Sequence, residues 1–113
     1  MTEVQRTAEF TEWLQAVQDS IARAAILARL DRLALGNPGD ARSVGEGVSE
    51  LRIEVGPGYR AYYMRIGAVT LLMLAGGDKS TQDRDIQRAL QMSRELRAAS
   101  KGAAKAKQAR KPK

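Results

Sequence analysis

Charged and phenolic side chains recur at alternate positions of two neighbouring stretches, residues 51–55 and 59–66. Alternation of this kind is the period of half-buried strands, whose successive side chains point to opposite faces of a sheet. The glycines and proline of residues 56–58 predict a tight turn between the two strands. If the apolar positions face a core, the opposite face carries a charged patch made of Arg52, Glu54, Arg60 and Tyr62. Lys79, in a loop expected at residues 76–79, lies within reach of its rim.

A patch of this composition fits a phosphodiester. Arginine binds phosphate in bidentate fashion and stabilises the charge that develops on a pentavalent phosphorus. Glu54 or Lys79 is a candidate acceptor for a ribose 2′-hydroxyl proton, and the Tyr62 phenol is suited to stack on a base. Alternating arginine and glutamate is equally typical of a solvated sheet surface with weak cross-strand ion pairs. Spacing alone leaves both interpretations open.

The composition excludes several kinds of chemistry. The 113 residues, enough for one domain, include no cysteine and no histidine. This excludes disulfides, thiolate chemistry and cysteine metal sites, and it removes the commonest general base and metal ligand. We therefore expect no metal and no cofactor. No apolar run approaches the ~18 residues of a membrane span, and the N-terminus lacks the layout of an export signal, which favours a cytoplasmic protein without a membrane partner.

The net charge of +6 is concentrated at one end of the chain. Residues 97–113 hold seven basic residues and no acidic one, whereas residues 1–96 hold 12 basic and 13 acidic residues. The body is therefore nearly neutral, and its overall charge gives no reason to expect nucleic-acid binding. We expect a domain over residues 1–98 and a basic tail over residues 99–113 that is disordered or a frayed helix.

The elements that position the charged patch begin with a helical hairpin over residues 8–35. Its first helix has an apolar face and Thr7 as its cap, and its second begins at Asp19 or Ser20. Residues 2–6 are a candidate edge strand, and the apolar run 69–75 predicts a central strand covered on both faces. A third helix follows, capped by Ser80 or Thr81, with Ser80 and Asp83 at capping-box spacing. The order β-α-α-β-β-β-α predicts an α+β fold, with the hairpin packed on a twisted antiparallel sheet.

Two longer stretches carry a resemblance to a known family. GVSELRIEVGPGYRAYY (47–63), followed by LLMLAGGDKSTQDRDIQRA (71–89), resembles the phage-type, HigB-like branch of the RelE/ParE toxin superfamily, which includes addiction module killer proteins. The segment EFTEWLQAVQDSIARAAILARLDRLALGNPGD (9–40) resembles the same branch. The resemblance spans about residues 3–93, and the GPGYR and GGDKSTQ motifs are specific to this branch when they occur together.

The resemblance implies a function as well as a fold. RelE-like toxins cut mRNA in the ribosomal A site and use arginine, lysine, glutamate and tyrosine rather than histidine. They belong to type II toxin–antitoxin modules, in which a small helix-turn-helix antitoxin, encoded nearby, neutralises the toxin. The resemblance therefore implies a ribosome-dependent mRNA endoribonuclease that inhibits translation, with mRNA and an antitoxin as partners.

The motifs also imply roles for single residues. Arg60 matches the strand arginine that contacts the scissile phosphate in RelE-like toxins, and Arg52 matches the first of two basic strand positions before it. Glu54 occupies the second of those positions, where RelE itself has a lysine, so Glu54 becomes a candidate base. Lys79 falls near the place of a later arginine. Tyr62 or Gln82 would take the RNA-binding place of the C-terminal tyrosine of RelE, although neither matches it firmly.

Two other functions stay open at this point. ParE-type relatives share the fold and inhibit DNA gyrase instead of cutting RNA. The chain would alternatively be an inactive relative that only binds an antitoxin-like regulator. The arginine and glutamate positions and the GGDKSTQ motif favour the ribonuclease.

Overall fold

The computed structural model describes the backbone of residues 2–109 and the side chains of residues 2–100. The elements are β1 (Glu3–Arg6), α1 (Ala8–Ala16), α2 (Ser20–Ala34), β2 (Ala41–Gly45), β3 (Val48–Ile53), β4 (Tyr59–Arg65), β5 (Thr70–Asp78), a 3-10 turn (Lys79–Thr81) and α3 (Gln82–Ala109). The α+β class is confirmed, with one strand more than the sequence predicts. None of the helices in the described range is long and apolar enough to cross a membrane.

The five strands form one mixed sheet in the order β1-β5-β4-β3-β2. β1 is the edge strand expected near the N-terminus, but it runs parallel to β5, so the prediction of a wholly antiparallel sheet is wrong at this edge. β2, at the other edge, was not predicted. Its sequence ARSVG offers little apolar alternation because an exposed edge strand has little to bury.

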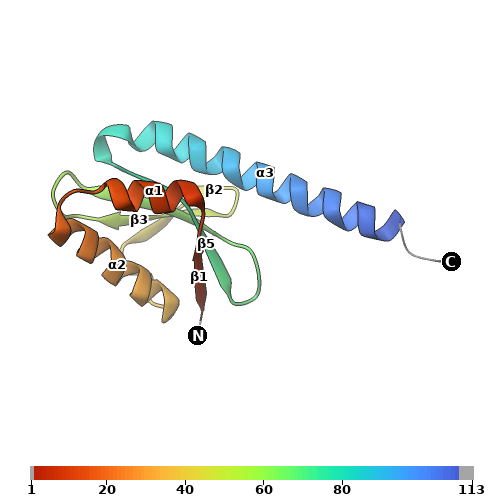
Figure 1. Cartoon of the computed structure of the whole chain (residues 1–113), viewed down its shortest axis with the longest axis horizontal. Coiled ribbons are helices and arrows are strands. Elements are labelled where there is room, and N and C mark those ends of the chain that lie inside the picture. The colour runs from red at the N-terminus through yellow and green to blue at the C-terminus, as the bar shows by residue number, and fades with distance from the viewer. Residues whose placement is uncertain (1, 110–113) are drawn as a thin grey trace.

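Helices α1 and α2 pack on one face of the sheet, as expected for the helical hairpin (Figure 1). The Thr7 hydroxyl caps α1 by accepting a hydrogen bond from the Phe10 N–H, and the Asp19 carboxylate caps α2. Between the helices and the sheet lies a core that includes Phe10, Ile26 and Leu51, all fully buried.

Helix α3 covers the opposite face, which the sequence predicts as an exposed charged patch. Val48, Met64 and Leu74 point to this face and pack against Ala89 and Leu90 of the helix, along with other apolar side chains. The prediction of an exposed patch is therefore wrong where α3 covers the sheet. The predicted charged residues are uncovered only where β3 ends and β4 begins, beside the start of α3.

Strand β5 is buried on both faces, as its apolar run predicts, and it continues to Asp78. The prediction of a loop over residues 76–79 is therefore wrong. A side chain on Gly76 would collide with the Trp13 ring, and one on Gly77 would collide with the Asp85 carboxylate. The two glycines allow α1 and α3 to approach the strand closely from opposite sides.

The start and the end of α3 also differ from expectation. Asp78, rather than Ser80 or Thr81, caps the 3-10 turn that leads into the helix, in a capping box with Thr81. The helix runs to Ala109, past the predicted domain boundary at residue 98, and Figure 1 shows it continuing beyond the sheet. Residues 110–113 lie outside the described part of the chain, so the expected character of the tail stays a prediction.

Candidate functional site

Arg60 is the centre of the candidate site. It lies opposite Arg52 of β3 and opposite Gly77 of β5, on the face that α3 covers. Its side chain is 6% exposed, and its Nη1 lies 3.0 Å from Oε1 of Glu54. The same Nη1 donates to the Tyr59 carbonyl oxygen at 3.1 Å. Its Nε is buried, and the N–H of this atom donates to no acceptor within the described residues.

Glu54 and Lys79 meet Arg60 at the turn between β3 and β4. Gly58, in this turn, has a φ of +83°, and a side chain there would touch Glu54, Arg60 and Lys79. The Lys79 N–H donates to the Gly58 carbonyl oxygen at 2.8 Å, which fixes the 3-10 turn against the sheet. Glu54 keeps 61% of its side chain exposed. The structure thus brings together three of the four residues that the sequence predicts as catalytic, which we call the Glu54–Arg60–Lys79 cluster.

Arg52 lies beside the cluster, and Asp40 compensates its charge. Its Nη2 and Nε lie 2.7 and 3.1 Å from Oδ1 of Asp40, and its backbone N–H donates to the Asp40 carbonyl oxygen. The side chain is 38% exposed. Asp40 is a partner that the sequence interpretation missed, because it follows a glycine- and proline-rich loop with no periodicity to place it.

Of the two residues predicted to bind RNA, Tyr62 is buried, whereas Gln82 is half-buried and lines a surface hollow. Tyr62 is fully buried, and its hydroxyl donates to Oε2 of Glu50 at 2.9 Å. Gln82 donates to the same oxygen at 3.0 Å from the first turn of α3. The prediction that the Tyr62 ring is available to stack on a base is wrong, because α3 covers the part of the sheet on which it lies.

Glu50 is a fully buried carboxylate that the sequence interpretation missed. Burial alone would raise its pKa, but hydrogen bonds from Arg42, Gln82 and Tyr62 outweigh burial and hold the pKa below its usual value. The pKa of Tyr62 is raised, first by burial and then by its hydrogen bond to Glu50, so the phenol stays protonated. Glu50 has the same strand parity as Arg52, which was the signal available in the sequence.

A second buried carboxylate supports the 3-10 turn. Asp85 is 8% exposed, lies against Gly77 and accepts a hydrogen bond from the Thr81 hydroxyl. At the other end of the turn, the hydrogen bond from the Ser80 hydroxyl lowers the pKa of Asp78, so this cap is charged at neutral pH. Both contacts fix the segment that carries Lys79.

The cluster combines an exposed carboxylate, a buried guanidinium and an exposed ammonium. A guanidinium paired with a carboxylate, with the Cβ of a lysine against the same turn, suits a substrate that carries a phosphodiester and a hydroxyl to be deprotonated. In the part of the chain that the structure describes, no group of three or more carboxylates is placed to hold a metal ion. The side chains of the cluster are themselves suited to acid–base and electrostatic roles.

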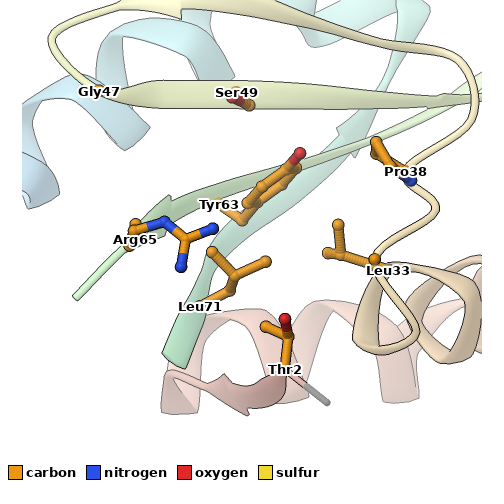
Figure 2. Close-up of a pocket in the computed structure, with 9 residues that line it drawn as sticks. Thr2, Leu33, Pro38, Gly47, Ser49, Tyr63, Arg65 and Leu71 are labelled. Atoms are coloured by element: carbon orange, nitrogen blue, oxygen red, sulfur yellow. The ribbon is translucent and has the colours of Figure 1, made fainter. Parts of the chain in front are cut away.

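A hollow of the surface lies away from the cluster. It has a volume of about 350 Å³ and opens on the α1–α2 face, where α2 ends. Figure 2 shows Arg65 and Leu33 on opposite sides of the Tyr63 ring in this hollow. None of the predicted site residues lines it, whereas Lys79 and Gln82 line a separate hollow of about 330 Å³ at the start of α3.

Comparison with known proteins gives a relative but no activity. No family model matches the chain. Over 94 residues, 83% of this chain, the sequence is 45% identical to a protein of Haemophilus influenzae strain Rd. The alignment covers 95% of that protein, whose name is "Uncharacterized protein".

Proposed function

The chain belongs to the same family as this uncharacterized Haemophilus influenzae protein, and from its own residues we propose that it is a ribosome-dependent mRNA endoribonuclease. It would act as the toxin of a type II toxin–antitoxin module, with a helix-turn-helix antitoxin encoded nearby as its partner. The observation that carries the proposal is the convergence of Glu54, Arg60 and Lys79 on the Gly58 turn. The resemblance of residues 3–93 to HigB-like toxins supports the same reaction.

In this reaction Glu54 removes the proton from a ribose 2′-hydroxyl. The 2′ oxygen then attacks the neighbouring phosphorus and the bond from phosphorus to the 5′ oxygen breaks, which gives a 2′,3′-cyclic phosphate. The 5′ oxygen leaves as a hydroxyl, with the Lys79 ammonium or solvent as its proton donor. Arg60 compensates the charge on the phosphorus oxygens, and burial of its guanidinium makes that interaction stronger than it would be in water.

Burial also holds the Arg60 side chain in one position before a substrate binds. Its contact with Glu54 holds the side chain in place, and a phosphate oxygen that replaces Glu54 would bind at Nη1. Arg52 lies opposite Arg60 in the register and is exposed enough to exchange Asp40 for a neighbouring phosphate. The two arginines would therefore bind successive phosphates of one RNA strand.

Primer extension on a defined mRNA in a cell-free translation reaction tests the proposal. The protein should produce new 5′ ends within codons, and only while ribosomes are translating. Glu54→Gln should lower the rate by about 10²–10⁴-fold, as expected for loss of a general base. Glu12→Gln, at an exposed position of α1, is the matched control and should cleave normally.

Two results would contradict the proposal. Intact message with normal protein synthesis would exclude cleavage on the ribosome. Accumulation of cleaved DNA–gyrase complexes without loss of mRNA would instead identify a ParE-type inhibitor.

A further inference from the structure

A second hollow lies at the end of the molecule that carries the Glu54–Arg60–Lys79 cluster. It has a volume of about 460 Å³ and lies at the elbow between α1 and α2. Trp13 and Tyr59 are its aromatic residues, and Gln18, Asp19 and Asp78 are polar residues that line it. We call it the aromatic hollow.

The two rings of the aromatic hollow contact each other edge to face. Their centroids are 6.2 Å apart and their planes are inclined at 66°. Trp13 is held from behind by Phe10 and by the bare backbone of Gly76. Both Trp13 and Tyr59 are only half-buried, so their orientation is fixed while part of each ring stays accessible. Fixed, accessible rings are what a stacking surface for planar groups requires.

The aromatic hollow and the cluster lie on opposite faces of the same end of the sheet. Tyr59 precedes Arg60, Asp78 precedes Lys79, and Tyr59 and Asp78 are register partners in neighbouring strands. A side chain on Gly56 would touch the Tyr59 ring, whereas one on Gly58 would touch the cluster. One short turn therefore has the aromatic ring on one side and the phosphate-binding residues on the other.

The polar residues of the aromatic hollow are rich in hydrogen-bond acceptors. Asp19 makes both of its capping bonds through Oδ1, and no hydrogen bond to its Oδ2 exists among the described residues. The exposed Gln18 amide and the Asp78 carboxylate add further acceptors. Two carboxylates repel a phosphate, but they accept hydrogen bonds from the amino groups of bases.

We propose that the aromatic hollow binds an amino-bearing nucleobase of the RNA strand whose phosphodiester lies at Arg60. The inference rests on the proposed ribonuclease function and names the part of the substrate that this end of the molecule recognises. The base stacks on Tyr59 and Trp13, and its amino group donates to Asp19 or Asp78. Adenine, guanine and cytosine carry such a group and uracil does not.

Trp13 is the single tryptophan of the chain, so its fluorescence reports occupation of the aromatic hollow directly. The probes are 2′-O-methylated trinucleotides, which lack the attacking hydroxyl and are not cut. The adenine and cytosine trinucleotides should quench the fluorescence in a saturable way, and the uracil trinucleotide should bind more weakly. Equal affinity for all three would overturn the proposal.

Tyr59→Leu should weaken binding of the adenine trinucleotide by about fivefold to 150-fold, the range expected for loss of one base–aromatic stack. Tyr63→Leu is the matched control, because Tyr63 lies on the same face of β4 and is also half-buried. It should leave the affinity unchanged. Equal affinities of the two variants would overturn the proposal.

Asp19→Asn gives an independent test if Tyr59→Leu fails to fold. Asparagine caps a helix as well as aspartate does, so the variant should fold and lose its preference for cytosine over uracil. An unchanged preference would contradict the role of Asp19. Quenching by trinucleotides without any translation-dependent cleavage would overturn the ribonuclease function but support base binding in the aromatic hollow. Cleavage without quenching would support the ribonuclease function but overturn base binding there.

Discussion

At the scale of single residues, the site depends on charges that the fold has already paired. Arg60 is held by Glu54, Arg52 by Asp40, and Glu50 by Arg42, Tyr62 and Gln82. Arg52 and Asp40 are both partly exposed, whereas in the first pair only Glu54 is exposed and Arg60 is buried. In the Glu50 network Glu50 and Tyr62 are buried and Arg42 is partly exposed, and the network joins β2, β3 and β4 to the first turn of α3.

Arg60→Lys tests the geometry of the guanidinium rather than its charge. Lysine keeps the positive charge beside Glu54 but loses the planar fork that matches a phosphate. The rate of mRNA cleavage should fall by about 10²–10³-fold, as expected for loss of one transition-state donor. Arg65→Lys, at an exposed position of the same strand, should cleave at the normal rate. Equal rates for the two variants would remove Arg60 from the site.

Glu50→Gln tests the buried network through the pH dependence of stability. The folded pKa of Glu50 is lowered, so its stabilising contribution is fully present above the unfolded pKa of about 4.3. The contribution is lost as the pH falls through the folded pKa. The variant should lose about 1–3 kcal/mol at neutral pH, and its thermal midpoint should decline less steeply as the pH falls from the unfolded pKa to the folded pKa. A decline as steep as that of the unmodified protein would show that other carboxylates govern acid unfolding.

At the scale of elements, β5 decides how closely the two helical layers approach. Its Gly76 lies under Trp13 and its Gly77 under Asp85. The missing side chains let α1 and α3 contact the same strand from opposite faces. The position of Lys79 depends on this contact, because Asp85 and Thr81 fix the turn that follows the strand.

Gly77→Ala should therefore destabilise the protein through overpacking. The added methyl group would displace Asp85 and the start of α3, at a cost of about 1–3 kcal/mol or more. Gly67→Ala is the control, since a side chain there meets Thr70 only at ordinary contact distance. Thermal unfolding of both variants measures the difference. A midpoint for Gly77→Ala equal to that of the control would mean that Asp85 does not require the bare strand.

The elements show where sequence patterns predict structure and where they do not. Helical spacing predicted α1 and α2 with their caps Thr7 and Asp19, because their buried faces repeat regularly. Alternation placed Arg52 and Arg60 on one face, which the register confirms. It did not show that α3 would cover Tyr62, because the alternation placed charged residues on this face, although the apolar run 69–75 predicted a strand covered on both faces. Nor did it reveal β2 or the parallel pairing of β1, which depend on contacts between distant segments.

At the scale of the whole molecule, the charge is divided between a nearly neutral body and a basic end. Six of the cations lie in residues 101–113, and without them the formal net charge of +6 becomes zero. The buried side chains of α3 in the described range end at Ser93. In the described range, residues 101–109 therefore lie beyond the part of the helix that packs on the sheet.

Ending the chain at Ser100 should leave the thermal midpoint unchanged and weaken binding to single-stranded RNA. A plot of log affinity against log salt concentration should become flatter by up to about 4, because each neutralised phosphate contributes about 0.7 to the slope. Salt titration of the full and shortened chains measures this difference. Identical slopes would show that the basic end does not touch RNA.

The parallel pairing of β1 with β5 has a consequence for how the chain is made. β1 leaves the ribosome first, yet its neighbour follows 67 residues later, the separation that the hydrogen bond from Thr7 to Leu74 spans. At about 5–20 residues per second, the ribosome needs roughly 3–13 s to supply that partner. β1 therefore stays without its neighbour until β5 has been made. The sheet can close at this edge only after β5 has been made.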